Sequence, residues 1–205
     1  NLAFMAPLTP FRHFAMGEES MERAATAEEA SRIAALLKEA VAAGAFGFST
    51  TTLPQHIGFQ GRPLACRLAS RDELKAYANS LRDLGRGVIE VALTRRAGRV
   101  AEDEQELLQF LLTESGRPVT WLGMSSQPKN PEATAETMAR LEPLIRRGGV
   151  PQVLPKPFVV QMDLRNPFSF ADTESWNQVF NQPPEAQKQI YRDPNFRNRW
   201  RAEMK

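Results

Sequence analysis

The sequence is poor in the residues that form disulfides or bind transition metals. Cys66 is the only cysteine, so a disulfide within the chain is excluded, which fits a reducing compartment such as the cytoplasm. His13 and His56 are the only histidines. No apolar run approaches the length of a membrane span, and no basic-then-apolar signal peptide opens the sequence. We therefore expect a cytoplasmic protein without a membrane partner.

The sequence also has almost no excess of one sign of charge over the other. The 205 residues carry a net charge of +2, which is too small to indicate a nucleic-acid partner, and their number suffices for one domain with a sizeable core. The one basic cluster, typical of a solvated helix face, consists of Arg192, Arg197, Arg199, Arg201 and Lys205. The sequence opens at Asn1, without a starting methionine and inside an apolar run, so we expect it to come from a longer protein.

Short apolar runs alternate with helical stretches over the first three quarters of the chain. The expected strands are 3–8, 45–49, 87–93, 118–122 and 150–154, and the expected helices are 26–44, 70–81, 103–114 and 131–145, with a long loop at 53–68. Thr26 with Glu29, and Ser70 with Glu73, have the spacing of capping boxes. Strict alternation predicts an α/β fold with a parallel sheet. Periodicity does not separate an open doubly wound sheet from a closed barrel. No Gly-rich phosphate loop follows the first strand, which argues against a nucleotide-binding open sheet.

The character of the chain changes near Phe158. Prolines and aromatic residues indicate a loop followed by short helices, the last one capped by Asp193 and opened by Pro194. We therefore predict a β/α segment at 1–157 and a segment of loop and short helices at 158–205 that packs on it.

Four stretches in this order resemble the N-acyl-D-amino-acid deacylase (D-aminoacylase) branch of the amidohydrolase superfamily. They are Asn1–Phe4 with Arg12 and Ala15-Met16-Gly17; Ala24-Ala25-Thr26, Glu28-Glu29 and 43–50; Glu73-Leu74 with 85–88; and Asn166-Pro167-Phe168 with 191–194 and Arg197. Among them, Gly47-Phe48-Ser49-Thr50 after an Ala-Gly-Ala turn is the most specific.

The resemblance implies an internal part of a (β/α)8 TIM-type barrel. It implies one or two divalent metal ions, usually zinc, at the strand ends, with a metal-bound hydroxide that attacks an amide carbon and an aspartate that shuttles the proton. A complete barrel takes about 250 residues and eight strands, so about five β/α units would need the remainder of the barrel from the same or another chain. The implied parent protein is a hydrolase of a C–N amide bond in an N-acyl amino acid or a similar small amide.

The sequence departs from this pattern at the metal site. The resemblance implies His-x-His on the first strand, which is absent here, and histidines at positions occupied by Ala92, Gly123 and Leu8. We therefore identify no metal ligand and no catalytic residue in this chain. The alternative hypotheses are a non-catalytic amidohydrolase-like barrel that binds ligands or has a structural role, and a complete small-molecule-binding α/β module. The oligomeric state stays open.

Seven residues are candidates for substrate binding. They are Ser49, Thr50, Thr51, His56, Glu90, Gln152 and Lys156, all expected at strand mouths or in the loop that follows the second strand. Glu90 interrupts an apolar strand, where a carboxylate is costly unless paired, so the competing interpretation is a structural pair with Arg95 or Lys156. Cys66 lacks an activating base. Packing explains Trp121, Trp176 and Trp200 better than ligand stacking does, and His13 is expected in a polar turn.

Overall fold

The computed structural model describes residues 2–54, 56–58, 62–96, 98–126, 130–153, 159, 161–170, 173–180 and 182–204. The chain divides into two compact units, one made of Asn1–Leu53 with Leu64–Lys156 and the other of Pro54–Pro63 with Pro157–Lys205. The predicted division into 1–157 and 158–205, with the second part packing on the first, stays a prediction. None of the described helices is long and apolar enough to cross a membrane.

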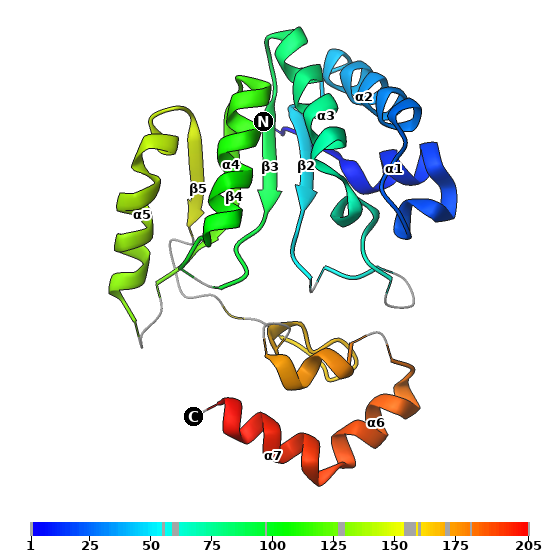
Figure 1. Cartoon of the computed structure of the whole chain (residues 1–205), viewed down its shortest axis with the longest axis vertical. Coiled ribbons are helices and arrows are strands. Elements are labelled where there is room, and N and C mark those ends of the chain that lie inside the picture. The colour runs from blue at the N-terminus through cyan, green and yellow to red at the C-terminus, as the bar shows by residue number, and fades with distance from the viewer. Residues whose placement is uncertain are drawn as a thin grey trace. The chain divides into compact units, whose positions relative to one another are not determined.

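The first unit contains a parallel sheet of five strands in sequential order (Figure 1). The strands are β1 (Ala6–Pro7), β2 (Gly47–Thr51), β3 (Val88–Ala92), β4 (Val119–Met124) and β5 (Gly149–Val153). The helices are α1 (Leu8–Met16), α2 (Ala27–Ala42), α3 (Arg71–Leu84), α4 (Glu102–Ser115) and α5 (Glu132–Ile145), with 3-10 turns at Gly17–Met21 and Ala65–Leu68.

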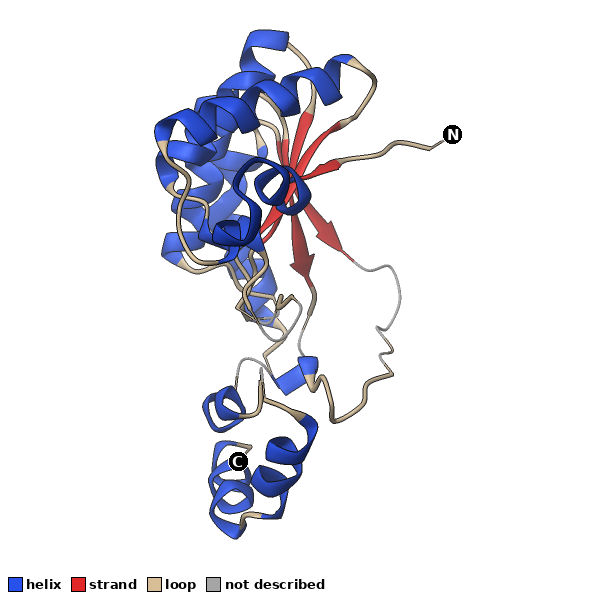
Figure 2. Ribbon diagram, turned by 90° about the vertical axis from the view of Figure 1, so that its right-hand side faces the viewer, coloured by secondary structure: helices blue, strands red, loops and turns tan. Residues whose placement is uncertain are grey.

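The order of the strands and the placement of the helices decide between the two architectures that the sequence left open. A doubly wound sheet reverses its strand order once and carries helices on both faces. Here the order never reverses, and the helices lie on one face of the sheet only (Figure 2). This is the arrangement of an arc of a (β/α) barrel, in which the helices form the outer ring. The prediction of a partial barrel of about five β/α units is confirmed.

Local capping explains where the helices begin and end. The Thr26 hydroxyl accepts a hydrogen bond from the Glu29 amide while Glu29 accepts one from the Thr26 amide, and Ser70 and Glu73 repeat the exchange at α3. Both predicted capping boxes are thus confirmed. Gly116 ends α4 with a φ of 59°, a left-handed conformation that glycine adopts without steric cost.

One apolar core lies between the helices and the outer face of the sheet. Alternate strand residues supply the sheet side, and the helices supply their apolar stripes. The fully buried members on the strands are Phe48, Ile89, Val91, Val119 and Trp121, and those on α2, α3 and α4 include Ile33, Leu37, Tyr77, Leu81, Leu108 and Leu111. The interpretation of Trp121 as a packing residue is confirmed.

The N-terminal region differs from the expectation. The strand is confined to Ala6–Pro7, and the helix α1, which was not predicted, follows it directly. Pro10 lies in the first turn of α1, where the amide that proline lacks would have had no intrahelical partner. His13 consequently lies on α1 and not in a turn. The predicted loop 53–68 also contains the 3-10 turn Ala65–Leu68.

The second unit contains short helices around an aromatic cluster. Its elements are 3-10 turns at Phe168–Phe170 and Glu174–Gln178 and the helices α6 (Pro184–Arg192) and α7 (Pro194–Glu203). Trp176 lies at the centre, with its ring centroid 4.4 Å from that of Phe170 and 5.2 Å from that of Trp200. Asp193 caps α7 by accepting a hydrogen bond of 2.8 Å from the Asn195 amide, as predicted. Packing therefore accounts for Trp176 and Trp200.

Candidate functional site

The face of the sheet that no helix of the first unit covers is hereafter called the inner face. In a parallel sheet, residues paired in register point to the same side, and successive residues alternate between the two sides. Ser49 pairs with Glu90, and Glu90 pairs with Thr120. Their neighbours Phe48, Ile89 and Val119 are fully buried against the helices. Ser49, Glu90 and Thr120 therefore line up across the inner face on three adjacent strands.

Gln152 connects this row to the edge strand β5. Its side-chain amide nitrogen, Nε2, lies 3.3 Å from Glu90 Oε1 and 3.1 Å from Thr120 Oγ1. The Thr120 hydroxyl in turn donates a hydrogen bond of 2.8 Å to the Val150 carbonyl. Ser49, Glu90, Thr120 and Gln152 form what we call the polar band. Three of these four residues were predicted site residues, and Thr120 was missed because a threonine in a strand is unremarkable by itself.

Glu90 has a different partner from the one expected. The predicted pair with Arg95 is wrong: Arg95 forms an ion pair of 2.9 Å with Glu104 and another with Asp103. Arg95 follows β3, and its guanidinium turns toward the first turn of α4, where these two carboxylates lie. Hydrogen bonding to Asp103 is the main cause that raises the pKa of Arg95. Lys156, the other expected partner, lies outside the described residues.

The two threonines that follow Ser49 have different surroundings. Thr50 pairs in register with the fully buried Val91, so Thr50 lies on the side of the sheet that the helices cover. Thr51 is on the inner side, but its hydroxyl donates to the Ala92 carbonyl at 3.0 Å and accepts from the Leu53 amide at 3.1 Å. Backbone groups thus use both hydrogen-bonding capacities of Thr51. A substrate-binding role for Thr50 and Thr51 stays a prediction.

The two histidines lie in different units. His56 is partly exposed and belongs to the Pro54–Pro63 segment of the second unit, so its role as a substrate-binding residue stays a prediction. His13 lies on α1 in the first unit, with its Nδ1 atom 3.5 Å from the Ser20 hydroxyl.

The described residues do not fit a metal centre. They contain no group of three or more His, Cys, Asp or Glu side chains arranged to hold an ion. The three positions at which the resemblance implies histidines carry no side-chain donor atom: Ala92 at the end of β3, Gly123 in β4 and Leu8 at the start of α1. A metal ion at these strand ends would need ligands from outside the described part of the chain.

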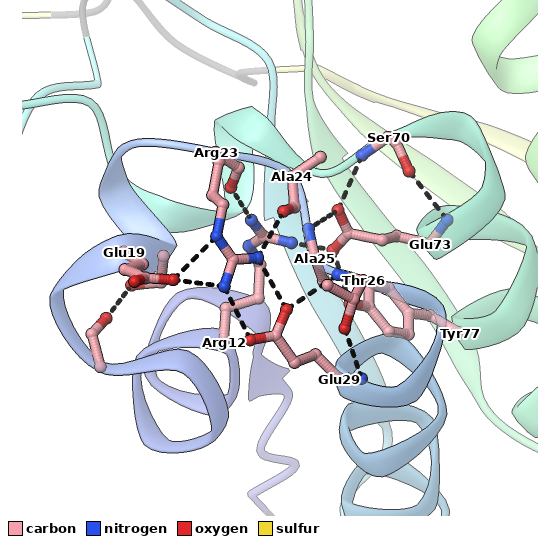
Figure 3. A network of polar contacts seen from close by, with 12 residues as sticks. Arg12, Glu19, Arg23, Ala24, Ala25, Thr26, Glu29, Ser70, Glu73 and Tyr77 are labelled. Carbon is pink, nitrogen blue, oxygen red and sulfur yellow. Dashed lines mark hydrogen bonds and ion pairs between the residues drawn. The ribbon is translucent and has the colours of Figure 1, made fainter.

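A second polar cluster lies behind the sheet, between α1, α3 and the segment that joins α1 to α2 (Figure 3). Arg12 and Glu73 form an ion pair there, and their side chains are 0% and 1% exposed. Glu73 also accepts hydrogen bonds from the Tyr77 hydroxyl at 2.8 Å and from the Ala25 amide at 2.7 Å. Arg12 donates one of 2.9 Å to the Arg23 carbonyl. The cluster therefore ties three segments together.

Burial dominates the electrostatics of this cluster. It lowers the pKa of Arg12 and raises that of Tyr77, because a charged group loses its hydration when it is buried. At the exposed end of the same cluster, hydrogen bonds from Arg23 lower the pKa of Glu29 from 4.5 to about 2. No side chain of the cluster lies on the inner face, and its contacts are all internal. The cluster therefore acts as a structural framework and not as a binding site.

Comparisons with known proteins agree with this geometry. No protein-family model and no curated protein matches the chain. Among solved structures, the chain is similar to D-aminoacylase. One of these structures, which concerns the binuclear metal centre of D-aminoacylase, has a TM-score of 0.55 and 26% sequence identity. The match covers 74% of this chain and 29% of the D-aminoacylase chain. A mutant D-aminoacylase in complex with copper chloride has a TM-score of 0.55 and 25% sequence identity. A crystal structure of D-aminoacylase that defines a novel subset of amidohydrolases has a TM-score of 0.54 and 25% sequence identity.

The first unit is part of a (β/α) barrel, with its helices outside and the polar band inside. More narrowly, it has the D-aminoacylase-like fold of the amidohydrolase superfamily, which confirms the resemblance seen in the sequence. The chain spans 29% of the length of the D-aminoacylase chains that it matches.

Proposed function

We propose that this chain is part of a hydrolase that cleaves a C–N amide bond in an N-acyl amino acid or a similar small amide, and that the inner face contributes to its substrate site. The observation that carries the proposal is the match of the arc to D-aminoacylase. The place of Gln152, one residue before the carboxyl end of β5, supports it, because a (β/α) barrel keeps its ligand sites at the carboxyl ends of its strands.

The chain's own residues would bind and orient the substrate. Gln152 holds Glu90 by a hydrogen bond, and Thr120 holds Gln152, so the rotamers of the band are restrained before a ligand arrives. Ser49 adds a hydroxyl in register beside Glu90. Such a preorganised set loses less conformational entropy on binding than free side chains do. His56, Thr50, Thr51 and Lys156 remain proposed substrate-binding residues.

We also propose that the hydrolase depends on a divalent metal ion whose ligands lie outside the described residues of this chain. The neighbouring D-aminoacylase has a binuclear metal centre, and a divalent ion, zinc in the usual case, would lower the pKa of bound water and polarise the amide carbonyl. Since the described residues do not fit such a centre, its ligands would come with the remainder of the barrel, from the same or another chain. A cytoplasmic location is likewise a proposal.

The second candidate is a non-catalytic barrel of the same fold that binds a ligand or has a structural role. One observation favours it: Ala92 and Gly123 carry no donor atoms at the two strand positions where the resemblance implies histidines. In that case the polar band would still bind a ligand, but no amide would be cleaved.

One experiment separates the two candidates. The native protein, purified from its source with whatever chains accompany it, is assayed for bound metal by mass spectrometry and for release of free amino acid from N-acetyl-amino acids of both configurations. The hydrolase predicts bound divalent metal and a hydrolysis rate that a chelator abolishes and added metal restores. A folded, metal-free protein that releases no amino acid from any of these amides would contradict the proposal and favour the binding barrel.

A further inference from the structure

A pocket of about 210 Å³ lies where the helices α3 and α4 begin. Its walls come from the first turns of the two helices and from Thr52 and Arg95, which follow β2 and β3. Pockets that take drug-sized ligands have volumes of about 300–1,000 Å³. This pocket therefore suits a smaller ligand.

The pocket does not result from the limited span of the chain. Its walls belong to two consecutive β/α units in the middle of the arc, and all its lining residues are in the first unit. α3 contacts α2 as well as α4, and α4 also contacts α5. The remaining strands of a complete barrel would pair with the edge strands β1 and β5. They would leave the surroundings of this pocket unchanged.

Arg71 supplies a positive charge with unused hydrogen-bonding capacity. Its side chain is exposed and lies over the Phe110 ring of α4, with the guanidinium carbon 5.1 Å from the ring centroid. No carboxylate in the described part of the chain pairs with Arg71. The ring contact uses the flat face of the guanidinium and leaves the N–H groups at its edge available. A ligand carboxylate can accept two of these N–H groups in a bidentate arrangement.

Asp103 supplies a negative charge at the other side of the pocket. Its Oδ1 atom pairs with Arg95, whereas Oδ2 accepts no hydrogen bond from the described residues. Glu104 is fully engaged: Oε1 accepts from the Arg95 side chain at 2.9 Å, and Oε2 accepts from the Ala101 amide at 2.7 Å. The available oxygen of Asp103 therefore suits a ligand ammonium group.

The spacing along α4 separates the two charges. Asp103, Leu107 and Phe110 are at positions i, i+4 and i+7 and share one face of the helix. A rise of about 1.5 Å per residue places the first and the last of them about 10 Å apart along the axis. Leu107, between them, and Leu74 of α3 both line the pocket and are 6% exposed, so they form an apolar floor. A ligand that reaches both charges must carry its own at the two ends of an aliphatic chain.

We propose that this pocket binds a zwitterion whose carboxylate and ammonium groups are separated by an aliphatic chain, as in an ω-amino acid. Arg71 binds the carboxylate, Asp103 binds the ammonium, and Leu74 and Leu107 contact the methylene groups. The two arginines and two carboxylates that line the pocket balance, which suits a ligand without net charge. This binding is independent of the proposed hydrolysis.

The test compares three probes of similar length. ε-Aminocaproate, caproate and n-hexylammonium are titrated into the protein, with whatever chains accompany it, by isothermal titration calorimetry at low ionic strength. ε-Aminocaproate should bind at least about tenfold more tightly than the other two, because each of them lacks one charge-assisted hydrogen bond. Added salt should reduce this advantage. Glycine, whose two charges are too close together, should bind no more tightly than caproate.

Two variants assign the charges to residues. Arg71→Gln should lower the affinity for ε-aminocaproate to that of n-hexylammonium and leave the binding of n-hexylammonium itself unchanged. Asp103→Asn should lower it to that of caproate and leave caproate unchanged. Arg82→Gln and Asp83→Asn remove the same charges from exposed positions at the opposite end of α3 and should leave all three affinities unchanged.

Three results would overturn the proposal. They are an ε-aminocaproate affinity no higher than that of both analogues, an advantage that persists in Arg71→Gln or Asp103→Asn, and an equal loss in the control variants. If a variant does not fold, the three probes on the unchanged protein decide the matter. The assay of amide hydrolysis stays separate. A protein that prefers ε-aminocaproate but cleaves no amide would refute the hydrolase and leave this pocket standing, and the opposite result would do the reverse.

Discussion

The two faces of the sheet differ in polarity and in exposure to solvent. On the outer face, helices bury a continuous apolar core, and behind it Arg12 and Glu73 form an ion pair with almost no solvent exposure. On the inner face, polar side chains form a row, and Leu122 and Val150 remain exposed to solvent. The helices of this chain cover the outer face, whereas the inner face would meet the remaining strands of a complete barrel. Packing of the helices and the proposed ligand binding therefore involve different residues of the same strands.

The largest loss of stability is expected when one partner of the buried ion pair is removed. Arg12→Ala would leave the Glu73 carboxylate buried with only hydrogen bonds from Tyr77 and backbone amides. Removing one partner of a buried pair costs about 3–5 kcal/mol, because the remaining charge is neither hydrated nor paired. Urea denaturation followed by circular dichroism measures the loss.

The control for this variant is an ion pair at the surface. Lys38→Ala removes the partner of Asp83, and side chains of that pair are 46% and 61% exposed. Its expected cost is about 0–1 kcal/mol. Equal losses in Arg12→Ala and Lys38→Ala would show that the cluster behind the sheet is not the framework described above.

A matched pair of substitutions compares the two faces directly. Val91 is fully buried on the outer face, and Val150 is 51% exposed on the inner face. Val91→Thr buries a hydroxyl in an apolar core and should cost about 1–3 kcal/mol, whereas Val150→Thr should change the stability by less than about 0.5 kcal/mol. Thermal denaturation of both variants measures the difference. A large loss in Val150→Thr would mean that the inner face is already covered in the folded protein.

The smallest effect is expected at the exposed end of the framework and depends on pH. Hydrogen bonds from Arg23 lower the pKa of Glu29 from 4.5 to about 2, so ionised Glu29 stabilises the folded state above pH 4.5. This contribution is lost as the pH falls from 4.5 toward 2. The stability difference between the unchanged protein and Glu29→Gln should therefore shrink over this range, as acid titrations of both would show. A difference that stays constant would mean that Arg23 does not act on Glu29.

Part of the resemblance in the sequence lies in the framework. Arg12, Ala25, Glu29 and Glu73, which helped to suggest the amidohydrolase fold, all belong to the cluster behind the sheet. Arg86, another of these residues, donates hydrogen bonds of 2.9 Å to the Val41 and Ala42 carbonyls at the end of α2. Such residues are recognisable because their contacts depend on local spacing and on one backbone geometry. They indicate the fold and say little about the ligand.

The candidate site was less accessible to sequence reasoning. Ser49, Glu90 and Gln152 were identified separately, each from its place in a strand, but Thr120 was missed and Arg95 was given the wrong partner. Gln152 is 62 residues from Glu90 in sequence, and only the register of three strands brings the two side chains within 3.3 Å. The direction of the Arg95 side chain likewise depends on where α4 begins, since Asp103 and Glu104 lie in its first turn.

Local chemistry in the sequence determined the alternation of strands and helices, the two capping boxes and the αL end of α4, because each depends on residues a few positions apart. The choice of an arc over a doubly wound sheet, the position of α1 and the assembly of the polar band were decided by tertiary structure. These features depend on which face each helix covers and on the register between strands, and no pattern within a single segment specifies either one.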